Sequence, residues 1–115
     1  MDNSPNSKKL PGPNTRVINE QEQISPNPIK PEDADRKWEE FLGERPYTNI
    51  HPRTRQPDLN RLVSGDGHRS IRYGLHEMNS SSSKHHYHEE IWAYDSDTDT
   101  MTVQSTIVRV PLPKD

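Results

Sequence analysis

The large apolar residues of this chain are concentrated after residue 37, and this distribution limits what the chain can fold into. Only 26% of the 115 residues are hydrophobic, against roughly 45–50% in a typical globular domain. The first 30 residues carry five prolines among Asn, Ser, Lys and Gln. Because so little apolar surface cannot offset the entropy of ordering the whole chain, we expect residues 1–30 to form a disordered arm or linker. Residues 31–115 are then expected to form one small domain.

Residues 31–43 have the features of a single amphipathic helix. Pro31 suits the first helical position, and Gly43 supplies a stop signal. An apolar stripe recurs at the spacing of one helical face and consists of Ala34, Trp38, Phe41 and Leu42. We therefore expect this helix to pack through the stripe on a sheet.

After Gly43 the apolar residues follow the alternating pattern of strands. The strand-like segments are Arg61–Ser64, His68–Tyr73, His85–Tyr94 and Met101–Val110, with a shorter extended piece at Tyr47–Ile50. Gly65-Asp66-Gly67 is a hairpin signal, and strands joined by short turns pair antiparallel. The sequence therefore predicts an α+β fold, in which an N-terminal helix packs on a small antiparallel β-sheet of four to five strands, preceded by a disordered arm.

Several classes of protein are excluded by what the sequence lacks. There is no cysteine, so disulfides and thiolate metal sites are not available. No segment approaches the roughly 20 apolar residues of a membrane span, and the N-terminus lacks the apolar core of a signal peptide. We expect no membrane partner and a cytoplasmic location for the chain as given.

The charge is unevenly distributed along the chain. The formal net charge is −3, yet the segment from Asn49 to His88 holds six Lys or Arg against three Asp or Glu, together with all six histidines. A locally basic, histidine-rich segment suits an anionic ligand. A solvated surface with charges of both signs has the same composition, so both interpretations stay open.

The densest chemical cluster is the segment His85–Glu90, with the sequence HHYHEE. On a strand, His86 and His88 lie on one face roughly 6.5–7 Å apart. Metal-free cleavage of RNA needs a base, an acid and cations near the phosphorus, and the arginine fork suits phosphate. The groups available for proton transfer are His76, His86, His88, Glu77, Glu89 and Glu90. The cations available beside them are Arg69, Arg72 and Lys84.

Two further interpretations of this cluster stay open. The side chains of His86 and His88 suit a divalent metal such as zinc, although the cupin and His-Glu-x-x-His spacings are absent. A third ligand would then come from His68, His76, Glu77 or Glu90. In the other interpretation the cluster is a polar sheet surface, or the contact surface of a non-enzymatic binding module.

Four short motifs follow one another in the second half of the chain. They are YTNIHPRT at 47–54, DGHRSIRYG at 66–74, HEM at 76–78 and KHHYHEEIW at 84–92. In order and in amino-acid sequence, these motifs resemble those of the C-terminal toxin modules of bacterial polymorphic toxins. The modules meant are those of the Rhs type and the filamentous-haemagglutinin contact-dependent inhibition type. The resemblance covers about residues 35–112. The chain departs from the pattern at Arg55, where a glycine is expected, and in the serine-rich loop at 80–83, where a proline is expected.

The resemblance implies an activity, partners and a set of site residues. Many small α+β modules of this kind resemble the barnase and EndoU group of metal-independent ribonucleases. The resemblance therefore implies a toxin-like ribonuclease that acts on RNA without a cofactor and serves in bacterial competition. It also implies a cognate immunity protein and delivery into target cells as part of a larger secreted protein. The predicted catalytic residues are His76, Glu77, His86, His88 and Glu89. The predicted substrate-binding residues are Arg69, Arg72 and Lys84.

Overall fold

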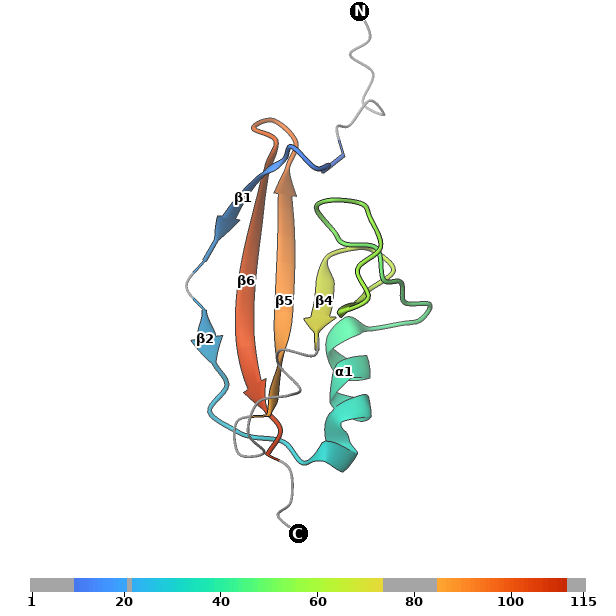
Figure 1. The fold of residues 1–115 in the computed structure, drawn as a ribbon, viewed down its shortest axis with the longest axis vertical. Coiled ribbons are helices and arrows are strands. Elements are labelled where there is room, and N and C mark those ends of the chain that lie inside the picture. Colours follow the sequence, from blue (N-terminus) through green and yellow to red (C-terminus); the bar gives the residue numbers. More distant parts are fainter. Residues whose placement is uncertain (1–9, 21, 74–84, 112–115) are drawn as a thin grey trace, which may run out of the picture.

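The structure is a computed structural model that describes residues 10–20, 22–73 and 85–111. Its centre is a mixed six-stranded sheet with the order β1-β6-β5-β4-β3, in which β2 also pairs with β6 (Figure 1). The strands are β1 (Arg16–Asn19), β2 (Gln23–Ile24), β3 (Arg61–Val63), β4 (Arg69–Arg72), β5 (His86–Asp95) and β6 (Thr100–Arg109). The predicted α+β class is confirmed.

The predicted helix is present and packs on the sheet. A 3₁₀ turn, Pro31–Asp33, leads into α1 (Ala34–Leu42). Gly43 ends the helix with a φ of 87°, a backbone conformation that glycine adopts without steric cost. The Trp38 ring lies 5.2 Å from the ring of Tyr73 and 5.3 Å from that of Tyr87. Within the described ranges, no helix has the length and apolarity needed to cross a membrane.

The four strands after the helix pair antiparallel, as predicted. The hairpin of β5 and β6 is the longest, with ten Cα pairs from His86↔Arg109 to Asp95↔Thr100. On its other side β5 pairs with β4, and β4 pairs with β3. The short predicted piece near Tyr47 contributes isolated bridges, Thr48 to Val63 and Ile50 to Pro57.

The predicted strand number and the uniformly antiparallel pairing were wrong, because part of the expected arm joins the sheet. Strands β1 and β2 run parallel to β6 and lie along its outer edge (Figure 1). Glu20 N donates to Val103 O at 2.9 Å, and Ser25 N donates to Ile107 O at 2.8 Å. The edge of a ten-residue strand presents unpaired backbone groups to any extended segment. Amino-acid composition does not predict this pairing, because the hydrogen bonds are formed by backbone atoms. The prolines that suggested a disordered arm lie outside both strands.

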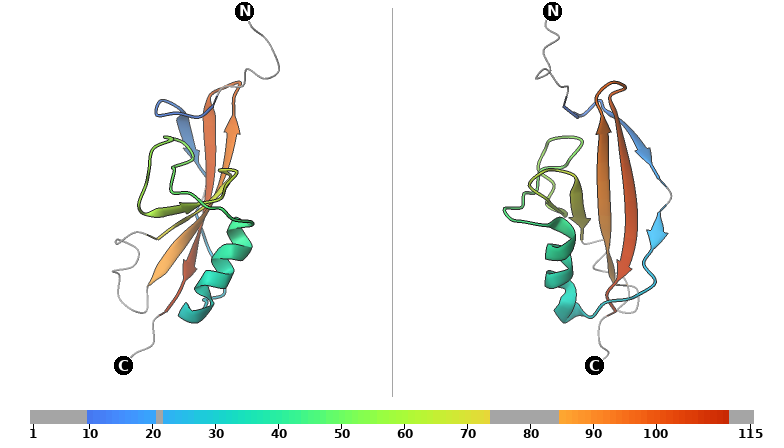
Figure 2. Two further views of the ribbon diagram at one scale, coloured as in Figure 1. Left: turned by 90° about the vertical axis from the view of Figure 1, so that its right-hand side faces the viewer. Right: turned by 180° about the vertical axis from the view of Figure 1, so that it is seen from behind.

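The two faces of the sheet are covered by different segments of the chain, a helix on one and a loop on the other (Figure 2). We call the side that α1 covers the helix face and the opposite side, where loop 44–60 lies, the loop face. The helix face has an apolar core made of Leu42, Ile71, Tyr87, Val108 and Val110. The loop face has a smaller apolar cluster at one end, made of Trp92, Met101 and Val103. Strand alternation places His86, His88, Glu90 and Trp92 on the loop face.

Candidate functional site

The loop face is built around the carboxylate of Glu90. This residue is 3% exposed and accepts two parallel hydrogen bonds from Arg61, Nε to Oε1 at 2.8 Å and Nη2 to Oε2 at 3.0 Å. The hydroxyl of Ser70 donates to Oε1 at 2.7 Å. Burial alone would raise the pKa of Glu90, but the hydrogen bonds and charge of Arg61 hold it below its ordinary value. Glu90 is therefore a fixed anion at neutral pH.

Further contacts hold the partners of Glu90 in place. Asp58 accepts a hydrogen bond from Arg61 Nη1 at 2.6 Å, and the Arg61 guanidinium lies 5.9 Å from the centre of the Trp92 ring. The indole Nε1 of Trp92 donates to Ser70 Oγ at 2.8 Å. We call Asp58, Arg61, Ser70, Glu90 and Trp92 the Glu90 cluster. A buried ion pair of this kind is held in one geometry because most of its hydrogen-bonding capacity is used.

A row of three basic side chains, one arginine and two histidines, lies next to the Glu90 cluster. Arg72 is the Cα partner of Arg61 on β3 and of His88 on β5, so all three residues stand side by side on the loop face. The rings of His86 and His88 are 5.1 Å apart and roughly perpendicular. His88 is 5% exposed, whereas His86 is half-buried. Two imidazoles and one guanidinium predicted from the sequence therefore converge on this face.

The N-terminal segment contributes a carboxylate to this row. Glu22, next to β2, places Oε2 at 3.3 Å from His88 Nδ1. Ser105 on β6 lies between them, with its Oγ 3.2 Å from His88 Nδ1 and 3.4 Å from the Glu22 carboxylate. Contacts at Nδ1 fix the orientation of the ring and direct Nε2 away from them. The pairing of Gln23 and Ile24 with β6 thus brings the neighbouring Glu22 carboxylate to the candidate site.

Loop 44–60 adds a histidine, His51, that the sequence analysis did not select for the site. His51 packs edge-on against the Trp92 ring at 5.2 Å. Its Nδ1 accepts a hydrogen bond from Arg53 N at 3.0 Å. Burial and the nearby charge of Arg61 lower the pKa of His51, so this ring is neutral at pH 7.

Two of the predicted site residues lie on the helix face, away from His86 and His88. Arg69 stacks over the Phe41 ring at 5.3 Å and donates from Nη1 to Phe41 O at 3.0 Å. It therefore holds a carbonyl at the C-terminal end of α1. Glu89 is half-buried, and burial raises its pKa, opposed by the charges of Arg69 and Lys37. These two side chains point to the opposite side of the sheet from Arg72 and Glu90.

The remaining predicted residues, His76, Glu77 and Lys84, lie outside the described residues. Among residues 10–20, 22–73 and 85–111, no group of three His, Asp or Glu side chains is arranged to hold a metal ion. A pair of adjacent imidazoles is present at His86 and His88.

Arg61 and Glu90 are central to this site but were not among the predicted catalytic and substrate-binding residues, although the sequence analysis named Glu90 as an available proton-transfer group and a possible metal ligand. A signal for Glu90 was present, because two-residue alternation along β5 places it on the same face as His86 and His88. Arg61 gave no such signal, since its position beside Glu90 depends on the pairing of β3 with β4 and of β4 with β5.

Comparisons of the chain with protein-family models, with curated proteins and with solved structures gave no match. A function must therefore be inferred from the chemistry of the loop face. Its described residues combine two imidazoles, a guanidinium beside them and a fixed carboxylate that organises a second guanidinium. This combination suits an anionic substrate whose reaction needs proton transfer.

Proposed function

We propose that this chain is a toxin-like, metal-independent ribonuclease that acts on RNA at the loop face. The observation that carries the proposal is the placement of His86, His88 and Arg72 side by side, next to the Arg61–Glu90 ion pair. Cleavage of an RNA phosphodiester without a metal requires proton transfer at two oxygens and stabilisation of negative charge at phosphorus. The loop face offers side chains for each of these tasks.

The two histidines are the proposed proton-transfer groups. One imidazole removes the proton of the 2′-hydroxyl, whose oxygen attacks phosphorus, and the other donates a proton to the departing 5′-oxygen. This reaction requires one ring in the neutral form, to accept a proton, and the other in the protonated form, to donate one. The contacts of His88 Nδ1 with Ser105 and Glu22 support a fixed ring that presents Nε2 to the substrate. His76 and Glu77 stay further candidates for these roles.

Arg72 is the proposed phosphate ligand, and Glu90 is a positioning residue. Arg72 is the Cα partner of His88, so it stands directly across from this residue on the neighbouring strand. Arg61 is held by Glu90 and Asp58. Glu90 is almost fully buried and accepts hydrogen bonds on both oxygens, which suits an anion that fixes its neighbours. Lys84 is a further proposed cation.

A direct assay tests the proposal. The purified chain is incubated with total RNA, with and without EDTA, and with duplex DNA in parallel. We expect RNA cleavage that EDTA does not reduce. The double substitution His86→Ala/His88→Ala should lower the cleavage rate by about 10²- to 10⁴-fold, the usual contribution of acid–base groups. Full activity of this folded double variant would refute the mechanism.

Matched substitutions on neighbouring residues assign the reaction to one face of the sheet. Arg72→Ala and Glu90→Gln alter the loop face, whereas Arg69→Ala and Glu89→Gln alter the helix face. We expect cleavage to fall strongly in the first pair and to persist in the second pair. The opposite result would move the site to Arg69 and Glu89, which the family resemblance favours together with Arg72 and the histidines.

The toxin part of the proposal predicts a cognate immunity protein and delivery into target cells as part of a larger secreted protein. It is supported by the resemblance of the four motifs to polymorphic-toxin modules. Expression of the unmodified chain in bacteria should stop growth, and the His86→Ala/His88→Ala variant should be tolerated. Equal growth with both chains, at equal protein levels, would argue against a toxic activity.

A metal-dependent nuclease is the second candidate, favoured by the adjacent imidazoles of His86 and His88. Cleavage that EDTA abolishes and zinc restores would make these residues ligands instead of proton-transfer groups. If the folded chain cleaves neither RNA nor DNA, a non-enzymatic binding module becomes the leading interpretation.

A further inference from the structure

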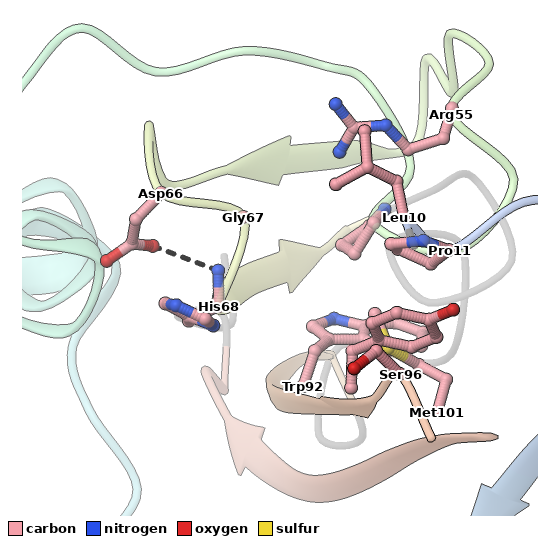
Figure 3. A pocket seen from close by; sticks show the side chains of 11 residues that line it. Leu10, Pro11, Arg55, Asp66, Gly67, His68, Trp92, Ser96 and Met101 are labelled. Carbon is pink, nitrogen blue, oxygen red and sulfur yellow. Dashed lines mark hydrogen bonds between the residues drawn. The ribbon is translucent and has the colours of Figure 1, made fainter. Parts of the chain in front are cut away.

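A cavity of about 390 Å³ lies on the loop face beside the Glu90 cluster. Its lining comes from distant parts of the chain: residues 10–11, the loop before β3, the turn between β3 and β4, and the upper part of the β5–β6 hairpin. Figure 3 shows Leu10, Pro11 and Arg55 on one side of it and Trp92, Ser96 and Met101 on the other, with His68 at its end. The cavity thus adjoins the candidate active site without being part of the catalytic group.

One side of the cavity includes two aromatic rings that are held by hydrogen bonds. Trp92 donates from Nε1 to Ser70 Oγ at 2.8 Å, and Tyr94 donates from its hydroxyl to Asp99 Oδ1 at 2.7 Å. Both residues line the cavity. Trp92 is 5% exposed and Tyr94 is half-buried, so Tyr94 supplies most of the aromatic surface open to an occupant and Trp92 supplies a small part of its ring.

Arg55 contributes an exposed cation on the other side of the cavity. Its φ is 62°, in the left-handed region where side chains other than glycine are strained. Strained residues are retained where a function requires their side chain, and here the side chain places a guanidinium at a cavity with an aromatic wall.

We propose that this cavity binds a nucleobase of the RNA substrate, stacked on the Trp92 and Tyr94 side and covered by Arg55. This inference rests on the proposed ribonuclease function and names the part of the substrate recognised next to the reacting phosphate. Aromatic rings and arginine guanidinium planes are the groups on which unstacked RNA bases lie. The volume is near the lower end of the roughly 300–1,000 Å³ of ligand sites, which suits one base with its ribose.

The position of the cavity relative to the histidines supports the same occupant. Trp92 and Glu90 are two residues apart on one strand, so they are separated by roughly 7 Å along the loop face. His88 stands a further two residues along the same face. A base in the cavity and a phosphate near His88 can therefore belong to neighbouring nucleotides of one strand.

The fluorescence of Trp92 provides a direct binding assay. The chain has two tryptophans, so the variant Trp38→Phe leaves Trp92 as the single indole fluorophore. This variant is titrated with AMP, GMP, CMP and UMP, and with ribose 5-phosphate as a ligand that lacks a base. We expect saturable quenching by the nucleotides, strongest for the purines because their stacking surface is larger, and none by ribose 5-phosphate. Calorimetric titration of the unmodified chain gives the same comparison without the substitution.

Substitutions at the cavity separate binding from folding. Arg55→Gly removes the guanidinium and the backbone strain together, so it should weaken nucleotide binding roughly 10-fold while leaving the melting temperature unchanged or higher. His68→Ala, at an exposed position, should also weaken binding. Tyr94→Phe keeps the ring and should bind normally, whereas Tyr94→Leu should not. Arg36→Ala, on the exposed surface of α1, is the matched arginine control and should have no effect.

The outcomes distinguish this inference from the proposed function. Quenching by ribose 5-phosphate equal to that by nucleotides, or equal nucleotide binding by Arg55→Gly, His68→Ala and the unmodified chain, would overturn the nucleobase site even if RNA is cleaved. Nucleotide binding that depends on Arg55 and His68, in a chain that cleaves no RNA, would keep the site and reject the ribonuclease. Base-dependent binding together with a lower kcat/KM for RNA in Arg55→Gly is the result we expect.

Discussion

The two faces of one sheet place chemically similar residues in opposite environments. On the helix face, Arg69 caps a helix end and Glu89 lies in a partly apolar setting that raises its pKa. On the loop face, Arg61 and Glu90 form a buried ion pair in which the pKa of the carboxyl is lowered. Glu89 and Glu90 are adjacent in sequence, so the difference arises from strand alternation and from what covers each face. The comparison teaches that the identity of a charged residue says little about its role until its face is known.

The largest expected effect is on the free energy of unfolding, and it comes from substituting Arg61 on the loop face, with Arg69 on the helix face as the comparison. Arg61→Ala should lower the free energy of unfolding by about 3–5 kcal/mol, because it leaves the Glu90 carboxylate buried without its cation. Arg69→Ala removes an exposed hydrogen bond and a ring contact, and should cost about 1 kcal/mol. Urea unfolding monitored by circular dichroism measures both values.

A double variant tests the reason for this difference. Arg61→Met/Glu90→Leu removes both charges and should be more stable than Arg61→Ala alone, because no uncompensated charge is left. Equal losses for Arg61→Ala and Arg69→Ala would show that the two faces do not differ in the way we describe.

The pH dependence of stability should differ in sign between the two adjacent glutamates. The folded-state pKa of Glu90 lies below the ordinary value of 4.5, so its stabilising effect is present above that pH and is lost as the pH falls. Glu90→Gln should therefore be less stable than the unmodified chain at pH 7, with the difference shrinking in acid.

For Glu89 the folded-state pKa is raised, so its favourable contribution is present at low pH and is lost as the pH rises through that pKa. Glu89→Gln should therefore be more stable than the unmodified chain at pH 7 and similar to it in acid. Urea midpoints measured from pH 3 to pH 8 give both curves. Parallel curves for the two variants would contradict opposite pKa shifts.

The smallest effect is expected at the edge of the sheet, where β1 has one apolar residue toward each face. Val17 packs against the cluster of Trp92, Met101 and Val103, whereas Ile18 is 43% exposed. Val17→Ala should cost about 1 kcal/mol through lost apolar contact, and Ile18→Ala should stay within about 0.5 kcal/mol. A larger loss at Ile18, measured by thermal unfolding, would show that β1 is held mainly from the helix face.

Local sequence signals were sufficient for the helix and for the four antiparallel strands. The apolar stripe from Ala34 to Leu42 and the stop at Gly43 both correspond to features of α1. Alternation along His86–Asp95 also assigned His86, His88 and Glu90 to one face. These predictions succeed because capping, periodicity and turn formation depend on residues close together in the chain.

The strands of the N-terminal segment could not be predicted in the same way. Residues 16–19 and 23–24 have the composition of a flexible arm, and they become strands through hydrogen bonds to β6, more than 80 residues away in sequence. The contact between Glu22 and His88 depends on the same pairing. Such contacts are made by the backbone of distant segments and leave no local pattern.

The sequence by itself determined the α+β class, the helix, the antiparallel strands and the presence of a histidine-rich strand with arginines nearby. Only the tertiary structure decided that Arg61, Arg72, His88 and Glu90 share one face while Arg69 and Glu89 share the other. It also decided which carboxyl group has a lowered pKa and which a raised one. The physical reason is that secondary structure follows from local backbone preferences, whereas charge pairing, burial and cavity shape depend on strand register and on the segments that cover each face.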